Sequence, residues 1–142
     1  MIGYINLLDK IEAELLKDPF CKAVTRGDLY NVATNKQQIY PLSHIMVNSM
    51  GRSGYALRYN ISIYAMDVVK TDESNEEYVF NTQSLVLVRL IEQLLRGTLN
   101  ADKFQLVDGS DSYEFKRDQF EDKIGACIVT FDVLIPNEMP IR

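Results

Sequence analysis

Residues 36–69 constrain the fold of this chain more than any other stretch, because two apolar runs flank a short polar bend there. In the second run, every other residue from Leu57 to Ala65 is apolar or aromatic, which is the pattern of a strand with one buried face. The first run has apolar residues on both faces, which places it either inside a sheet or against a partner. Gly51 and Gly54 in the bend predict a hairpin with a loop longer than two residues. We therefore expect the rest of the chain to pack around this β-hairpin.

Residues 4–17 have the spacing of an amphipathic helix. Their apolar side chains recur at steps of three and four residues, which gives a helix one apolar stripe. Pro19 predicts the end of the helix, because the residue before a proline is disfavoured in helical conformation.

Residues 77–96 predict a second and stronger helix. Ser74 and Glu77 match a capping box at its start, although Asn81 and Thr82 offer a later start, and Gly97 predicts its end. The apolar pattern extends around the circumference, which predicts burial on more than one side. The stripe consists of Leu87, Leu90, Ile91, Leu94 and Leu95, with Leu85, Val86 and Val88 around it.

Residues 103–135 predict a return to strands. Residues 103–107 alternate, residues 108–111 (DGSD) form a turn, residues 113–115 resume a short strand, and residues 125–135 form a long, largely buried strand. The predicted fold class is α+β: one domain, residues 1–142, with a mostly antiparallel sheet, a long β-hairpin and two helices packed on one face.

The composition excludes several classes of protein. The net charge of -5 argues against a generic nucleic-acid binder, so we expect no sequence-specific nucleic acid as a partner. No apolar run reaches membrane-spanning length, and the N-terminus lacks the pattern of a signal peptide. Cys21 and Cys127 stand in apolar contexts far apart in sequence, which predicts two reduced, buried thiols.

The sequence contains few residues that suggest catalysis. The only histidine, His44, falls inside a predicted strand, which favours a structural, hydrogen-bonded role over general-base catalysis. The carboxylates Asp108, Asp111 and Glu114 do not match a calcium-binding loop, and no phosphate-binding glycine motif or serine elbow occurs. We therefore predict that the protein is not an enzyme and has no catalytic, cofactor-binding or metal-binding residues.

The aromatic composition is compatible with a protein interface. The chain has eight tyrosines, six phenylalanines and no tryptophan, and several tyrosines gather along the hairpin and at the start of the second helix. Tyrosine suits interfaces because it buries area and keeps a polar hydroxyl. The same residues also suit the core and rim of a sheet.

Five segments carry a resemblance to a known family. They are 36–48 (KQQIYPLSHIMVN), 66–69 (MDVV), 95–97 (LRG), 120–122 (FED) and 130–132 (TFD). Together they resemble small neck and tail-completion proteins from tailed phages of the Bacteroidetes, including crAss-like phages. The order of helix, long hairpin, helix and returning strands is also similar to the tail-terminator fold.

This resemblance implies a structural virion protein that is assembled in the cytoplasm of the bacterial host. It would form a homo-oligomeric ring, commonly of six subunits in terminators, and would bind the phage tail tube or head–tail connector proteins. A head–tail connector or adaptor remains an alternative. A less favoured alternative is a small-molecule-binding or enzymatic α+β domain that uses the sheet face near His44 and Tyr64.

A ring needs two different patches that meet on neighbouring subunits. We expect the hairpin tip, the acidic segment 72–77 and nearby basic residues to supply such patches. The candidate interface residues are Met50, Arg52, Tyr55, Arg58, Asp72, Glu73, Glu76 and Lys116.

Overall fold

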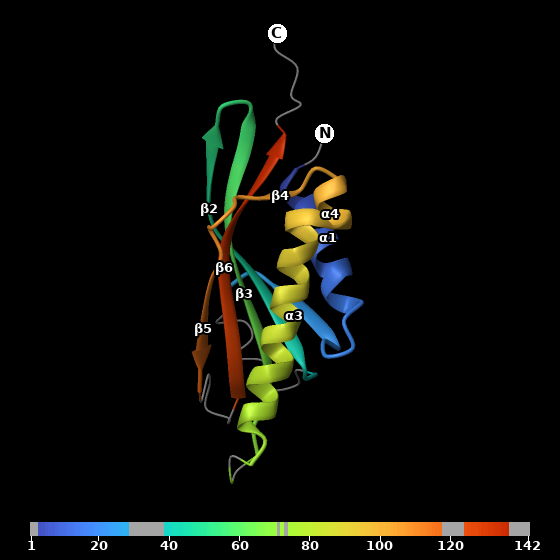
Figure 1. Ribbon diagram of the computed structural model, residues 1–142, viewed down its shortest axis with the longest axis vertical. Helices are drawn as coiled ribbons and strands as arrows, with labels where there is room; N and C mark the ends of the chain where they lie inside the picture. Colours follow the sequence, from blue (N-terminus) through green and yellow to red (C-terminus); the bar gives the residue numbers. More distant parts are fainter. Residues whose placement is uncertain (1–2, 29–38, 71, 73, 118–123, 137–142) are drawn as a thin grey trace.

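A computed structural model describes residues 3–28, 39–70, 72, 74–117 and 124–136. The described chain is α+β, with helices lying on one face of a six-stranded sheet (Figure 1). The predicted α+β class, with a mostly antiparallel sheet, is therefore confirmed, whereas the similarity to the tail-terminator fold stays a prediction. The helices are α1 (Tyr4–Leu16), α3 (Glu76–Arg96) and α4 (Thr98–Ala101), and the strands are β1 (Ala23–Arg26), β2 (Leu42–Ser53), β3 (Ala56–Val68), β4 (Gln105–Leu106), β5 (Ser112–Lys116) and β6 (Ile124–Pro136).

The sheet has the strand order β1-β2-β3-β6-β4, and β5 also pairs with β6. All pairs are antiparallel except β1 with β2, which is parallel. Strand β1 was not among the predicted elements. The residues that follow it, Leu29, Val32 and Ala33, have a weak strand pattern in the sequence and lie outside the described residues.

The predicted hairpin is formed by β2 and β3, which pair from Leu42↔Met66 to Ser53↔Ala56 with an irregularity between Val47 and Ser49. Because β2 lies between β1 and β3, the first apolar run is an inner strand, one of the two predicted placements. At the hairpin bend, Gly54 has a φ of 61°, a conformation that glycine adopts without steric cost.

The main core lies between the sheet and the helices. Leu7, Ile11 and Leu15 of α1 and Leu87 and Leu94 of α3 are almost completely buried against it. From the sheet, alternate residues of β3 and β6 enter this core, as the alternation predicted: Tyr59, Ile61, Ile63 and Ala65, and Cys127, Val129, Phe131, Val133 and Ile135. A second cluster of buried residues, which includes Leu42, Met66 and Ile128, lies on the other face.

Helix α3 is buried on one side only, so the prediction of burial on more than one side was wrong. Val86, Leu87, Leu90, Ile91 and Leu94 are buried, as expected. Three residues assigned to buried positions are instead exposed by 39%, 42% and 36%: Leu85, Val88 and Leu95.

The ends of α3 correct one prediction and confirm another. The helix begins after Asn75, which makes no side-chain capping hydrogen bond, so neither the capping box nor the later start is found. At its end the backbone N–H of Gly97 donates to the Gln93 carbonyl. A Cβ at Gly97 would come within 2.8 Å of the Gln93 Cα, which explains the glycine.

The edge of the sheet beside β6 is interrupted, because β4 and β5 pair with different parts of β6. The expected strand over residues 103–107 is only two residues long, followed by the predicted turn, where Gly109 has a φ of 77°, and by β5. Across this interruption Ser110 Oγ accepts a hydrogen bond of 3.0 Å from the Asp132 N–H. The serine hydroxyl thus occupies a place that a backbone carbonyl would take in a continuous ladder.

Candidate protein interface

The tip of the β2–β3 hairpin extends past the helices at one end of the molecule (Figure 1). Met50 is 60% exposed and Tyr55 is 93% exposed, and Arg52 beside them is exposed as well. Large side chains that contact so little of their own chain are typical of contact surfaces. The structure therefore brings together three of the predicted interface residues.

Arg58 belongs to a different group. It is part of a row of polar side chains that crosses the helix-free face of the sheet below the tip. Arg58 forms an ion pair with Asp132, Asn60 donates to Asp132 over 2.7 Å, and Asn48 donates to Asn60 and Ser62 over 2.8 Å each. Arg58 thus already has a partner within the subunit.

Asp132 is the acceptor at the centre of this polar row. Burial raises its pKa, but hydrogen bonds from Asn60 and Arg58 outweigh burial, so the pKa of Asp132 lies below its ordinary value. The row is therefore a charged, internally bonded strip that holds β2, β3 and β6 in register.

The acidic candidates lie at the opposite end of the long axis from the tip (Figure 1). Asp72 is exposed, and its carboxylate accepts a hydrogen bond from the Ser74 N–H, which holds its pKa below the ordinary value. Glu76 begins α3 and accepts a hydrogen bond of 2.8 Å from Arg117. Lys116 is exposed on β5 at this same end, and Glu73 lies outside the described residues.

The predicted basic and acidic residues therefore do not form two separate, unpaired surface patches. Arg58 and Glu76 are paired within the subunit, and Lys116 lies near the acids rather than near the tip. Arg52 and Asp72 remain as exposed, oppositely charged residues at the two ends of the molecule.

Two further exposed apolar surfaces were missed. One is the solvent side of α3. The other is β5, where Tyr113 and Phe115 are 41% and 56% exposed, although the Phe115 ring lies 5.0 Å from the Phe80 ring. The signal was present in the alternation of residues 113–115, which we assigned only to a short strand.

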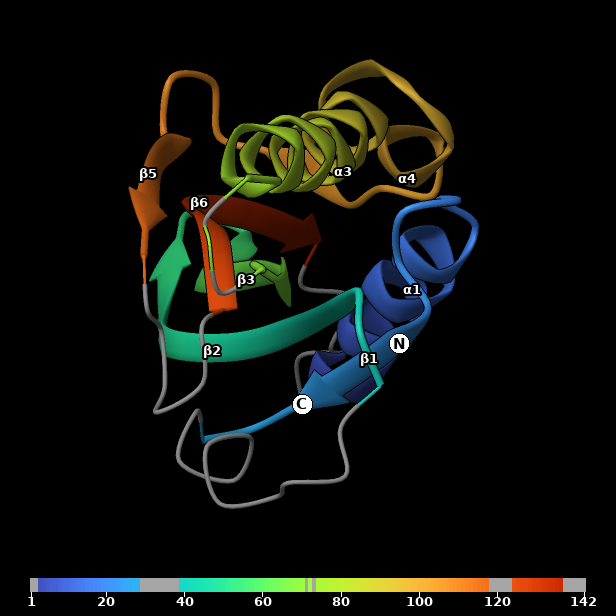
Figure 2. The same ribbon diagram turned by 90° about the horizontal axis from the view of Figure 1, so that it is seen from below.

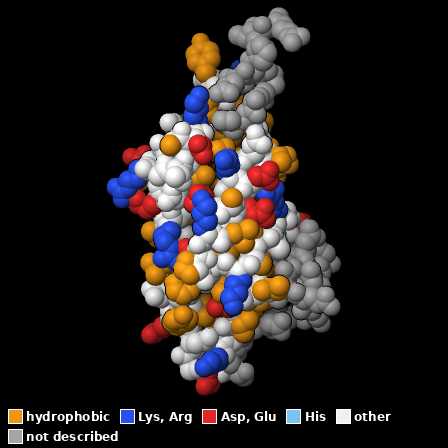
Figure 3. All heavy atoms as spheres, turned by 90° about the vertical axis from the view of Figure 1, so that its right-hand side faces the viewer, with side chains coloured by type: hydrophobic (Ala, Val, Ile, Leu, Met, Phe, Trp, Pro, Cys, Tyr) orange, Lys and Arg blue, Asp and Glu red, His pale blue; other side chains and the backbone are white. Residues whose placement is uncertain are grey.

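Charged and hydrophobic side chains are mixed on one side of the molecule. Figure 3 shows charged side chains along its whole length, with most of the larger hydrophobic groups in the lower half. Several charges of α1 are paired, since Arg26 contacts both Asp9 and Glu12 and Lys10 contacts Asp102.

His44 is fully buried, and both of its ring nitrogens are engaged. Nε2 lies 2.8 Å from the Gly27 carbonyl and Nδ1 lies 2.6 Å from the Thr25 hydroxyl. The carbonyl only accepts, so Nε2 carries the proton and Thr25 donates to Nδ1. Burial lowers the pKa of His44. This geometry joins β1 to β2 and leaves no ring nitrogen facing a ligand.

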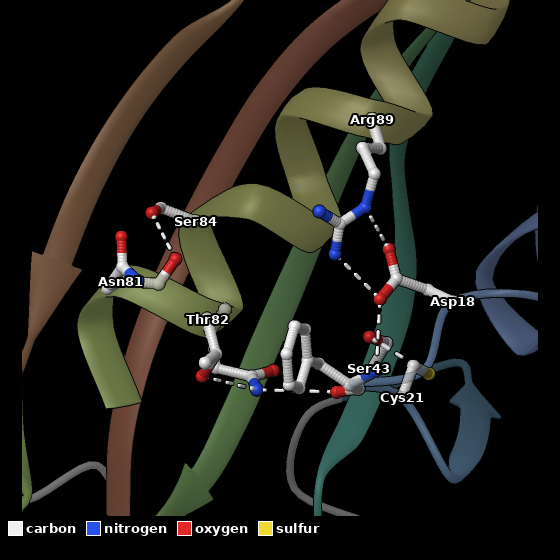
Figure 4. Close-up of polar contacts among 9 residues, drawn as sticks. Asp18, Cys21, Ser43, Asn81, Thr82, Ser84 and Arg89 are labelled. Atoms are coloured by element: carbon white, nitrogen blue, oxygen red, sulfur yellow. Dashed lines mark hydrogen bonds and ion pairs between the residues drawn. The ribbon is translucent and has the colours of Figure 1, made fainter. Parts of the chain in front are cut away.

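A cluster of polar side chains fixes the α1–β1 loop to α3 (Figure 4). Arg89 donates from Nε and Nη2 to Asp18 over 2.6 and 2.8 Å, and Gln83 donates to the Phe20 carbonyl over 3.3 Å. Among the described residues Gln83 Oε1 has no hydrogen-bond partner. Because Asp18 and Arg89 neutralise each other, this cluster anchors a loop rather than activating a reactive group.

Both cysteines are free and buried, as predicted. Burial raises the pKa of the Cys127 thiol to about 11 and also raises that of Cys21, so neither is an activated nucleophile. Within the described ranges, no group of three or more metal-ligating side chains comes together. No helix in the described part is long and apolar enough to cross a membrane.

Comparisons of the sequence with protein families and with curated proteins identified no relative. No protein-family model matches the sequence, and no curated protein matches it either.

Proposed function

We propose that this protein is a structural virion component of a tailed phage that forms a ring at the tail end or neck. The observation that carries the proposal is the hairpin that extends beyond the helices and exposes Met50, Arg52 and Tyr55 at its tip. The exposed side chains of Met50, Arg52 and Tyr55 contribute little to the subunit's own core and are available to a neighbouring subunit or a tail-tube protein. The resemblance of the sequence to tail-completion proteins supplies the identity of those partners.

The distribution of charge supports a head-to-tail ring. Such a ring requires that two different patches of one subunit meet on adjacent copies. Arg52 and Asp72 are oppositely charged, exposed and located at the two ends of the long axis. In the proposed ring, the tip of one subunit contacts the acidic loop of the next.

A head–tail connector or adaptor uses the same features and remains the second candidate. The alternative of a small-molecule site near His44 and Tyr64 has less support. Both nitrogens of His44 bind groups of the same chain, and the side chain is 0% exposed.

The proposal is tested by charge reversal in an assembly assay. The purified protein is mixed with tail tubes from the phage that encodes it, and rings at tube ends are counted by negative-stain electron microscopy. Arg52→Glu alone and Asp72→Lys alone should each reduce end-capped tubes at least fivefold. The double variant should restore capping, because it exchanges the two charges.

Lys103→Glu is the matched control, since Lys103 is exposed and belongs neither to the hairpin tip nor to the acidic segment 72–77, and it should cap tubes normally. Tubes that stay uncapped with wild-type protein, when heads of the same phage bind it, would favour the connector alternative. Failure to bind either structure would contradict the proposed function.

A further inference from the structure

The solvent side of α3 carries a regular stripe of side chains, here called the α3 stripe. Its members follow one another at alternating steps of three and four residues: Tyr78, Asn81, Leu85, Val88, Glu92 and Leu95. The four apolar members are exposed by 60%, 39%, 42% and 36%. A repeat of 3.5 residues is the spacing with which two helices pack along a shared seam.

The stripe is accessible. Figures 1 and 2 both show α3 as the outermost layer on its side of the sheet, and no other described element lies over its outer surface. The buried positions of the helix, such as Val79, Leu87 and Leu94, occupy the opposite side. The apolar members of the stripe therefore do not serve the subunit's own core.

The order of the side chains along the stripe is palindromic: apolar, polar, apolar, apolar, polar, apolar. In an antiparallel pair of identical helices, Tyr78 of one copy faces Leu95 of the other, and Leu85 faces Val88. Each apolar residue then meets an apolar residue. The polar layers bring Asn81 of one copy to Glu92 of the other, where the amide can donate to the carboxylate.

A parallel pair would be unfavourable for the same residues. Each position would face itself, so that the Glu92 carboxylates of the two copies would meet, each already bonded to Arg96 of its own chain over 2.6 Å, without the amide donor that Asn81 supplies in the antiparallel pair. Parallel helices would also align their dipoles, whereas antiparallel helices oppose them. The stripe is thus more complementary to itself in the antiparallel orientation.

We propose that two copies of this chain pair through the α3 stripe, with their helices antiparallel and related by a two-fold axis. Such an isologous contact uses the same patch on both copies. Four apolar side chains per copy make a small interface, near the lower end of specific contacts, so the dimer dissociates on dilution. The stripe lies along the side of the molecule, away from the tip, and its first member, Tyr78, follows the acidic segment 72–77 directly. The pairing depends on apolar side chains of α3, whereas the proposed ring contact depends on the charges of Arg52 and Asp72, so substitutions at different residues test the two contacts.

Sedimentation velocity across a concentration series tests whether the pair exists. The wild type should show a reversible monomer–dimer equilibrium, and Val88→Glu should raise the dimer dissociation constant at least tenfold. Leu16→Lys is the matched control, because Leu16 is a 49% exposed helical leucine on α1, and it should dimerise normally. A wild type that stays monomeric, or a dimer that survives Val88→Glu, would overturn the proposal.

Disulfide cross-linking tests the orientation. Leu85→Cys and Val88→Cys variants are oxidised separately and as a mixture, with circular dichroism to confirm that both are folded. The antiparallel pair predicts that the mixed species, Cys at 85 joined to Cys at 88, dominates. A product that forms equally well from Leu85→Cys alone would indicate a parallel pair and would contradict the proposal.

Discussion

The two halves of the β2–β3 ribbon have the same strand pairing but opposite surroundings. In the half under the helices, Ile45, Ile61 and Ile63 are almost completely buried, and β1 pairs with β2 there, whereas β3 pairs with β6 along both halves. In the half that extends beyond the helices, Met50 and Tyr55 are largely exposed. Backbone pairing therefore does not determine which half stabilises the fold, whereas side-chain burial does.

The largest expected effect comes from a matched pair of truncations, one in each half. Ile63→Ala removes a side chain that is 0% exposed and should lower the free energy of unfolding by ~2–5 kcal/mol. Met50→Ala should change it by no more than ~0.5 kcal/mol. Urea unfolding of both variants measures the difference, and equal losses would remove the distinction between the two halves.

The polar row lies at the boundary between the halves, so its effect should be intermediate. Asp132→Ala removes the acceptor of both Arg58 and Asn60 and should lower the free energy of unfolding by ~1–2 kcal/mol, because hydrogen bonds of this kind contribute ~0.5–1.5 kcal/mol each. Asp108→Ala, in an exposed turn, is the control. If the two variants unfolded at the same urea concentration, the row would have no role in holding the strands.

A smaller effect is expected in the pH dependence of the free energy of unfolding, through His44 in the buried half of the ribbon. Burial lowers the pKa of His44 in the folded state, so between that value and the unfolded pKa of about 6.5 the unfolded chain binds more protons. Stability should then fall as the pH falls below about 6.5. Urea unfolding at pH 7.5 and pH 5.5 should show a smaller loss in His44→Gln than in the wild type.

Comparing His44→Gln with the wild type removes the contribution of other titrating groups from the difference in pH dependence. Burial raises the pKa of Asp67, which favours folding at lower pH, but Asp67 is present in both proteins. Since His44 joins β1 to β2 within the subunit, His44→Gln should keep its assembly competence. Equal pH dependence of the two proteins would contradict the assignment of a neutral, buried histidine.

The sequence predicted those parts of the fold that depend on local periodicity. The hairpin, α1, most of α3 and β6 follow from steps of two or of three and four residues, and the structure has them within a few residues of the expected bounds. Strand β1 was missed because four residues carry too little pattern, and its parallel pairing depends on contacts with residues about twenty positions away.

The predicted burial of α3 on more than one side was wrong for a different physical reason. Leu94 and Leu95 are chemically identical neighbours, yet one is 0% and the other 36% exposed, because only one points at the sheet. The sequence shows that a helix carries apolar residues around its circumference. It does not show whether other elements of the same subunit pack against both sides of that helix. The same limit applies to the candidate interface, where the partners of Arg58 and Glu76, Asp132 and Arg117, are 74 and 41 residues away in sequence.

The central claim is that the exposed half of the ribbon serves contact rather than stability, and shortening the tip tests it most directly. In the test variant, residues 50–53 are replaced by a tight Asn-Gly turn, and both the urea midpoint and the capping of tail tubes are measured. The account predicts an unchanged midpoint and a loss of capping, because the tip lies outside the core but carries Met50 and Arg52. A variant that unfolds as the wild type does and still caps tubes normally would contradict the claim.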